Sequence, residues 1–210
     1  MSHALIRADA WEQYPRRAFA DWFSQLEGLR SPVVVGTRSE AGVDNAAIFN
    51  SLTHVGARPP HLGLVFRPLT VERHTYDNLK RTGVYTINHL PADRLEAAHN
   101  TSAKLAADRS EFEACGLTPQ VSSAGAPYVA EASVSMLLEF VEEHHIAAND
   151  TVFVVGAVRE LRLPPSATFE RGQIDWSELD ATPVSGLYSY YRVEPLRRLA
   201  YVSADDVSAR

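Results

Sequence analysis

The sequence predicts an α+β fold that is mainly β, with a mostly antiparallel sheet. Three observations lead to this prediction: about six short apolar runs, several with a period of two, only a few helical patterns between them, and strand spacings too short for repeated βαβ units. A barrel would suit such a sheet, because closure removes exposed strand edges. The 210 residues favour one domain over residues 1–210, with a core of about residues 31–160.

The first half of the predicted domain is one helix followed by three strands. The helix is predicted over residues 14–28, where Phe19, Trp22 and Phe23 stand at helical spacing and Gly28 ends the pattern. The strands are predicted at residues 32–37, 45–53 and 61–66, with turn-forming residues between them.

The second half mixes short helices with longer strands. A helix is predicted to begin at Thr75, which can cap it, and to end at Gly83. The remaining elements are predicted as strands at residues 84–90, 132–141 and 151–163 and helices at residues 91–99 and 108–115. Residues 166–210 form a less regular C-terminal extension.

Composition excludes several classes of function. The net charge is −6 and the 20 Lys and Arg residues form no basic stripe, so we expect neither nucleic-acid nor membrane binding. No apolar run approaches 18 residues, and the N-terminus lacks the pattern of a secretory signal. The single cysteine, Cys115, cannot form an internal disulfide, which makes the cytoplasm the expected location.

Neither a metal site nor a common catalytic motif is predicted. The histidines lack the tight spacing of zinc ligands, and His144 and His145 would point to opposite faces of one strand. The chain has no G-x-S-x-G nucleophile elbow and no G-x-G-x-x-G dinucleotide fingerprint after a strand.

Two clusters could bind a ligand. Residues 44–51 hold small residues that would let a flat molecule approach the strand backbone; a plain central strand is the alternative. Residues 73–78 place Arg73 before a helix N-terminus, where free N–H groups and the helix dipole favour a phosphate; an ordinary cap with a solvated arginine is the alternative.

These clusters, together with other short motifs, resemble the flavin reductase-like family of FMN-binding split barrels, which includes flavoredoxins. The resemblance covers about residues 31–158. It rests on the order of residues 45–51 (NAAIFNS), Pro59-Pro60, 74–79, 82–88, 98–102, 110–112, 116–118, 126–127 and 154–158. It implies a split β-barrel of antiparallel, Greek-key type with peripheral helices.

Four positions depart from the family's usual pattern. Ile48 and Asn50 stand where much of the family has proline and serine, and His74 stands where aspartate is common. Thr151 stands near the place of a histidine that many of the reductases carry; His144 or His145 could substitute for it.

The resemblance implies an NAD(P)H-dependent flavin reductase that binds FMN, an oxidoreductase in which hydride passes from the nicotinamide to the flavin. No side chain is then required as an acid or base, so we name none as catalytic. An FMN-bearing electron carrier without efficient NAD(P)H oxidation is the alternative, and a barrel that holds some other small ligand is a third.

The family's pattern also implies the residues that would bind FMN. Ala46, Ala47, Ile48 and Phe49 would contact the ring edge through their backbone, and Asn50 and Ser51 would lie near the ring or the ribityl chain. Arg73 and Thr75 would face the phosphate. The other expected cofactor-binding residues are Asn45, Arg67, His74, Asn78, Thr101, Ser102 and Lys104.

Two kinds of partner are expected besides the flavin and the nicotinamide. The aromatic residues around Tyr188 to Tyr191 offer apolar surface, so we predict a homodimer. A monooxygenase or another redox protein could receive the electrons.

Overall fold

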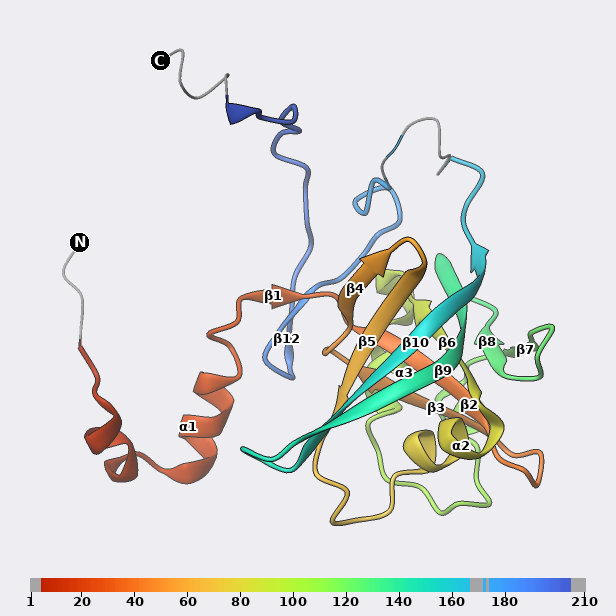
Figure 1. Ribbon diagram of the computed structural model, residues 1–210, viewed down its shortest axis with the longest axis horizontal. Coiled ribbons are helices and arrows are strands. Elements are labelled where there is room, and N and C mark those ends of the chain that lie inside the picture. The colour runs from red at the N-terminus through yellow and green to blue at the C-terminus, as the bar shows by residue number, and fades with distance from the viewer. Residues whose placement is uncertain (1–4, 167–171, 173, 205–210) are drawn as a thin grey trace.

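An antiparallel sheet of seven strands dominates the structure, a computed structural model that describes residues 5–166, 172 and 174–204 (Figure 1). The strands lie in the order β3-β2-β6-β9-β10-β5-β4. Every neighbouring pair is antiparallel, so the predicted mainly antiparallel β fold is confirmed. The strands are β2 (Val33–Arg38), β3 (Asp44–Phe49), β4 (Thr53–Ala57), β5 (Pro60–Phe66), β6 (Val84–His89), β9 (Val134–Ile146) and β10 (Thr151–Arg162).

The two edge strands of this sheet are neighbours in the sequence. Only residues 50–52 connect the end of β3 to the start of β4, so the two edges must lie close together and the sheet must curl. The Ser51 hydroxyl links the connection to β5: it donates to the carbonyl oxygen of Val65 (3.0 Å) and accepts from its N–H (3.1 Å). The sheet is therefore an almost closed barrel that is split between β3 and β4.

Short helices and strands surround the barrel. The helices are η1 (Ala8–Gln13), α1 (Arg16–Phe23), α2 (His74–Thr82), η2 (Ala92–Arg94), α3 (Leu95–Asn100) and α4 (Glu111–Cys115). The short strands are β1 (Leu29–Arg30), β7 (Pro119–Val121), β8 (Pro127–Val129), β11 (Val184–Ser185) and β12 (Ser189–Tyr190). The N-terminal segment with α1 and the segment after β12 both project from the barrel (Figure 1).

Two clusters of buried side chains form the core. The larger one fills the barrel and is closed by Leu79 of α2; its buried members are Val33, Val35, Leu64, Phe66, Leu79, Tyr85, Ile87, Leu138, Val152 and Val154. The smaller one lies between the sheet and the helices α3 and α4; its buried members are Val34, Ala46, Ala98, Phe112, Leu117 and Val129. The neighbours Val33 and Val34 belong to different clusters because successive residues of a strand face opposite sides.

Several predicted elements differ from the observed ones. The N-terminal helix ends at Phe23 instead of residue 28, and none of its residues is buried. The predicted strand 45–53 is interrupted after Phe49, where the chain leaves one edge of the barrel for the other. Helix α2 begins at His74, so Thr75 lies inside the helix and does not cap it. The predicted helix 108–115 begins only at Glu111, and residues 91–99 contain a 3₁₀ turn before α3.

The predicted helix ends are confirmed at two glycines. Gly83 follows α2 with φ 74°, and Gly116 follows α4 with φ 71°. Both angles lie in the left-handed region, which glycine adopts without a steric cost. Parts of the predicted domain limits and of the C-terminal extension, residues 1–4, 167–171, 173 and 205–210, lie outside the described residues.

No helix among residues 5–166, 172 and 174–204 is both long enough and apolar enough to span a bilayer.

Candidate functional site

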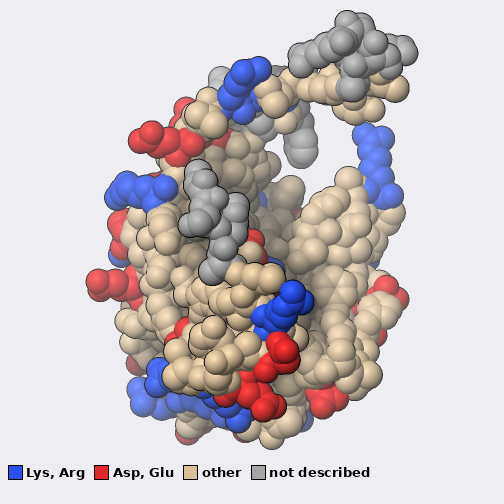
Figure 2. Space-filling model, turned by 90° about the vertical axis from the view of Figure 1, so that its left-hand side faces the viewer, with Lys and Arg blue, Asp and Glu red and all other residues tan. Residues whose placement is uncertain are grey.

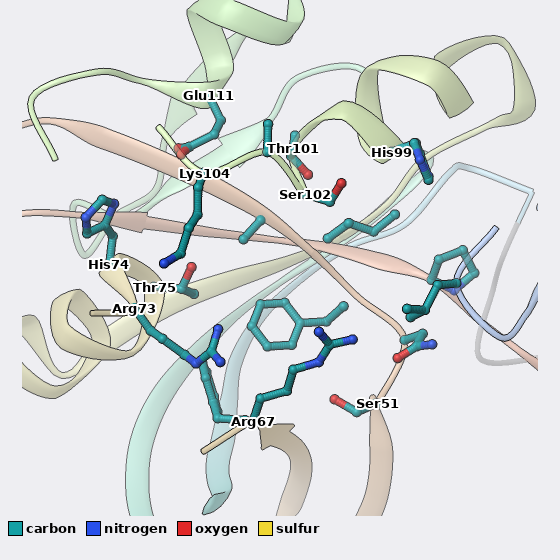
Figure 3. Close-up of a pocket in the computed structure, with 18 of the residues that line it drawn as sticks. Ser51, Arg67, Arg73, His74, Thr75, His99, Thr101, Ser102, Lys104 and Glu111 are labelled. Atoms are coloured by element: carbon teal, nitrogen blue, oxygen red, sulfur yellow. The ribbon is translucent and has the colours of Figure 1, made fainter. Parts of the chain in front are cut away.

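A pocket of about 670 Å³ opens beside the free edge of β3 (Figure 3). Its walls come from β3 and the connection to β4, the end of β5, the start of α2, the segment after α3, and the C-terminal residues 184–190. These segments are far apart in the sequence, so the pocket is a product of the tertiary fold.

Buried amides hold the start of α2 against the sheet. The Asn45 side-chain amide donates to the hydroxyls of Thr75 (3.0 Å) and Thr37 (3.3 Å), and the Asn78 amide donates to the same Thr37 hydroxyl (3.2 Å). All four side chains are buried. This network fixes the N-terminus of α2 at the pocket wall.

Basic side chains gather at this end of the pocket. Arg73, at the N-cap position of α2, donates from Nε and Nη2 to the carbonyl oxygen of Pro68, both at 3.3 Å. Within the part of the chain that the structure describes, Arg67 and Lys104 form no hydrogen bond or ion pair through their side chains. Together with the positive end of the α2 dipole they make this wall suited to an anion.

The segment after α3 adds hydroxyl groups on the facing side of this end of the pocket. The Thr101 hydroxyl donates to the carbonyl oxygen of Ala98 (2.7 Å) and is buried, whereas Ser102 is exposed. Figure 3 shows Ser102 and Lys104 on the same side of the pocket as Glu111, across from Arg67 and Arg73.

The edge of β3 offers backbone groups to a ligand. The N–H of Ala46 faces away from β2, since it donates to Oε2 of Glu111 (3.2 Å). Backbone N–H groups alternate in direction along an antiparallel strand, so the N–H of Ile48 faces the same free side. Ile48 lines the pocket, and its backbone can therefore bind the polar rim of a flat molecule.

The C-terminal segment closes the opposite end. The side-chain amide of Asn50 donates to the carbonyl oxygen of Gly186 (2.8 Å), and a hydrogen bond joins His99 Nδ1 to the Tyr190 hydroxyl (2.9 Å). Burial raises the pKa of the Tyr190 phenol, so the phenol stays protonated at neutral pH. The aromatic ring of Tyr188 packs edge-on to His99, with 6.3 Å between the ring centroids.

Most of the residues expected from the sequence meet in this pocket, and two do not line it. Ala46 is turned to the other side of β3, where it packs in the smaller core cluster, and Asn78 is buried behind α2. The lining residues are Asn45, Ala47, Ile48, Phe49, Asn50, Ser51, Arg67, Arg73, His74, Thr75, Thr101, Ser102 and Lys104.

The pocket also contains residues to which the sequence assigned no role there. Glu111 and His99 belong to motifs that carried the family resemblance, and Tyr188 and Tyr190 belong to the aromatic group assigned to a dimer interface. Within residues 184–190, the aromatic group was the feature that the sequence offered as a sign of a role. No local pattern connects this segment to the barrel, so its place in the pocket could not be predicted. His144 and His145 are exposed, lie outside the pocket lining and pair with Glu142 and Asp150.

Among the described ranges no three His, Cys, Asp or Glu side chains converge to hold a metal ion. The donors present fit a flavin nucleotide instead: cations and a helix N-terminus for a phosphate, a free strand edge for the polar rim of a ring, and apolar and aromatic walls for its faces.

Comparisons with known proteins agree with this geometry. A family model described as flavin reductase like domain matches residues 26–183. An uncharacterised protein of Halalkalibacterium halodurans is 30% identical over 105 residues; the match spans 49% of this chain and about half (50%) of that relative's length.

Solved structures resemble the whole fold. A split-barrel protein of Shewanella frigidimarina assigned as a flavin reductase is 37% identical, with a TM-score of 0.90 over 95% of this chain and 100% of that one. Nitrilotriacetate monooxygenase component B from Bacillus cereus is 20% identical (TM-score 0.82, 94% and 100% covered). Flavoredoxin of Desulfovibrio vulgaris is 21% identical (TM-score 0.70, 85% and 93% covered).

The fold is a split barrel of the kind described for the 37% identical Shewanella frigidimarina structure. The chain belongs to the flavin reductase like domain family, whose model matches most of its length.

Proposed function

We propose that this protein binds FMN in the pocket beside β3 and acts as a flavin reductase with NAD(P)H as the electron donor. The observation that carries the proposal is the grouping of Arg67, Arg73 and Lys104 around the N-terminus of α2, next to the free edge of β3. A molecule that joins a phosphate to a flat polar-rimmed ring satisfies both features at once.

The assignment of residues follows the two ends of the pocket. Arg73, Lys104 and the α2 N-terminus bind the phosphate, with Thr75, Thr101 and Ser102 beside it. The edge of β3 from Ala47 to Phe49 lies along the ring. Asn45 and Asn78 act through their hydrogen bonds to Thr37 and Thr75, which hold α2 in place.

Bound flavin would supply the capacity to accept a hydride, two electrons with one proton, from a reduced nicotinamide. The protein's residues bind, orient and shield. The phosphate wall sets the position of the ligand along β3, and the apolar side chains Phe49 and Phe66 keep water from one part of the wall, packed edge-on at 5.0 Å between centroids.

A second candidate is an FMN-bearing electron carrier without efficient NAD(P)H oxidation. Thr151 favours it, because this residue stands near the place of a histidine common in the reductases. Its hydroxyl donates to Oδ1 of Asn149 (2.7 Å) and it lies outside the pocket lining. The protein also shares its fold with flavoredoxin of Desulfovibrio vulgaris.

The absorbance spectrum of the purified protein followed by anaerobic titration with NADH and NADPH tests the proposal. We expect the flavin absorbance bands, directly or after FMN is added, and bleaching by at least one nucleotide. Bands that bleach with dithionite but with neither nucleotide would favour the carrier. A protein that takes up no FMN would refute both and would favour a different small ligand.

The partners follow from the chemistry. A flavin-consuming monooxygenase is a suitable acceptor, in keeping with the similarity to nitrilotriacetate monooxygenase component B.

We further propose a homodimer, because the terminal segments expose large apolar side chains. We also propose a cytoplasmic location, because the free Cys115 thiol suits a reducing compartment.

A further inference from the structure

The hairpin formed by residues 184–190 builds one wall of the pocket, and it lies beyond the part of the chain that the family model matches. Val184, Gly186, Leu187, Tyr188 and Tyr190 all line the pocket. This wall of the pocket therefore comes from a segment outside the matched range.

The hairpin is held from several sides. Its strand β11 pairs with β1, its strand β12 pairs with β11, and Val184 is buried. Asn50 donates to Gly186 and His99 is hydrogen-bonded to Tyr190, as described above. Gly186 has φ 62°, and a Cβ there would lie 2.9 Å from the side chain of Gln25, so this tight turn requires glycine.

Tyr188 differs from its neighbours in this fixed hairpin. It stands at the turn, lines the pocket and still exposes 62% of its surface. Its one ring contact among the described residues is the edge-on contact with His99, whose own ring is oriented by Tyr190. An aromatic ring that lines a pocket, is packed on one side and is exposed on the other is typical of a surface that stacks on a ligand.

Tyr188 lies at the opposite end of the pocket from the phosphate wall. Asn45 contacts Thr75 at the start of α2, and Asn50 contacts Gly186 in the hairpin. Four residues of β3 stand between the two asparagines, so that five residue steps span roughly 17 Å. A nucleotide anchored by its phosphate at α2 would thus direct its ring toward Tyr188 and His99.

We infer that Tyr188, supported by His99, is the stacking surface for a planar aromatic second substrate, one that exchanges electrons with the flavin. This rests on the proposed function, because the second substrate would lie between Tyr188 and the bound ring. The hairpin then determines which aromatic molecules reach the flavin, while the barrel binds the flavin itself.

The test measures the binding of two planar probes to the FMN-loaded protein by calorimetry. NAD⁺ and menadione serve as the probes, since neither reduces an oxidised flavin. We expect Tyr188→Ala to weaken the binding of at least one probe about five- to tenfold and Tyr188→Phe to change it less than twofold. The affinity for FMN, followed by flavin fluorescence, should stay within twofold in both variants.

Tyr191→Ala is the matched control, because Tyr191 is a half-exposed tyrosine of the same segment that lies outside the pocket lining. It should bind FMN and both probes as the wild type does. Unchanged probe binding in Tyr188→Ala, or no probe binding by the loaded wild type, would overturn the inference. An equal loss of FMN and probe in Tyr188→Ala would also overturn it, by placing Tyr188 in the flavin site. Failure of the wild type to bind FMN would instead refute the proposed function.

Discussion

Arg73 illustrates how one side chain can be held in place and remain available. Two of its five N–H donors are directed to the carbonyl oxygen of Pro68, and three remain for a ligand. The hydrogen bonds to Pro68 restrict the conformations of the Arg73 side chain before a ligand binds. Less conformational entropy is therefore lost when the guanidinium binds a ligand. Its position before α2 adds the attraction of the helix dipole.

Replacing Arg73 by alanine should weaken FMN binding roughly 10- to 100-fold, the effect of losing a charge-assisted hydrogen bond to a phosphate. Riboflavin has no phosphate, so its affinity should fall less than threefold. Fluorescence titration of both flavins measures the difference. Arg81→Ala, on the exposed side of the same helix, is the control and should change neither affinity. Equal losses for FMN and riboflavin would show that Arg73 does not bind the phosphate.

His89 should make the stability of the fold depend on pH. Its ring packs against Trp176 (4.8 Å between centroids), and burial lowers its pKa to about 4. An unfolded histidine binds a proton near pH 6.5, so between these values the unfolded state binds more protons and acid favours unfolding. The free energy of unfolding should fall as the pH is lowered from about 6.5 towards 4, with about 2 kcal/mol from His89 lost between pH 7 and pH 5.

Urea unfolding of His89→Asn at pH 7 and pH 5 checks this contribution. The variant should lose about 2 kcal/mol less than the wild type over this interval. His54→Asn, at an exposed position of β4, should behave as the wild type does. An identical pH dependence in wild type and His89→Asn would contradict the prediction.

At the scale of elements, α2 is positioned by polar contacts as much as by packing. Leu79 anchors the helix in the core, but its N-terminus is held by the amides of Asn45 and Asn78, which share the Thr37 hydroxyl. Sequence periodicity could place the helix and its end at Gly83. It could not show that Thr75 accepts a hydrogen bond from β3, because that depends on a contact between distant segments.

Replacing Thr37 by valine should destabilise the protein by about 1–3 kcal/mol, because the side chain keeps its shape while the Asn78 amide loses its acceptor in a buried site. Thermal or urea unfolding measures the loss. Thr53→Val, on an exposed position of β4, is the matched control and should change stability by less than about 0.5 kcal/mol. A Thr37→Val protein as stable as the control would show that the network contributes little.

Two elements whose limits were predicted wrongly, the strand at residues 45–53 and the helix at residues 14–28, differ from the structure for a common physical reason. The sequence predicts one strand over residues 45–53, yet the strand stops at Phe49, because residues 50–52 cross the open edge of the barrel. The N-terminal helix has apolar residues at helical spacing, but none of them is buried, and their rings pack against one another and against Trp11 and Tyr14. In both segments the local pattern is genuine, and the tertiary surroundings determine where the element ends.

At the scale of the whole molecule, many of the exposed large apolar side chains lie near the two ends of the described chain. Trp11, Trp22 and Phe23 pack against Phe19 in a cluster of their own, and each of these three rings remains more than two-fifths exposed. In the C-terminal segment Leu196 is 99% exposed and Tyr201 92%. Figure 2 shows broad uncharged areas on this side of the molecule, between scattered acidic and basic groups. Such surface is typical of an interface between copies.

Light scattering should therefore give twice the chain mass of 23.2 kDa. Combined replacement of Leu196 and Leu199 by serine should weaken the dimer and shift the mass towards that of one chain on dilution. Val55→Ser, an exposed residue of β4, is the control and should leave the dimer intact. A wild-type protein that scatters as a single chain would contradict the prediction.

The amino-acid sequence by itself determined the antiparallel β class, the glycine ends of α2 and α4, and the two clusters that supply two walls of the pocket, because these depend on local periodicity and backbone preference. Only the tertiary structure decided that residues 184–190 complete the pocket. Asn50 and Gly186 are 136 residues apart, and no local pattern encodes a contact between them. The physical reason is that long-range contacts hold this hairpin in place, and they form only when the barrel has folded.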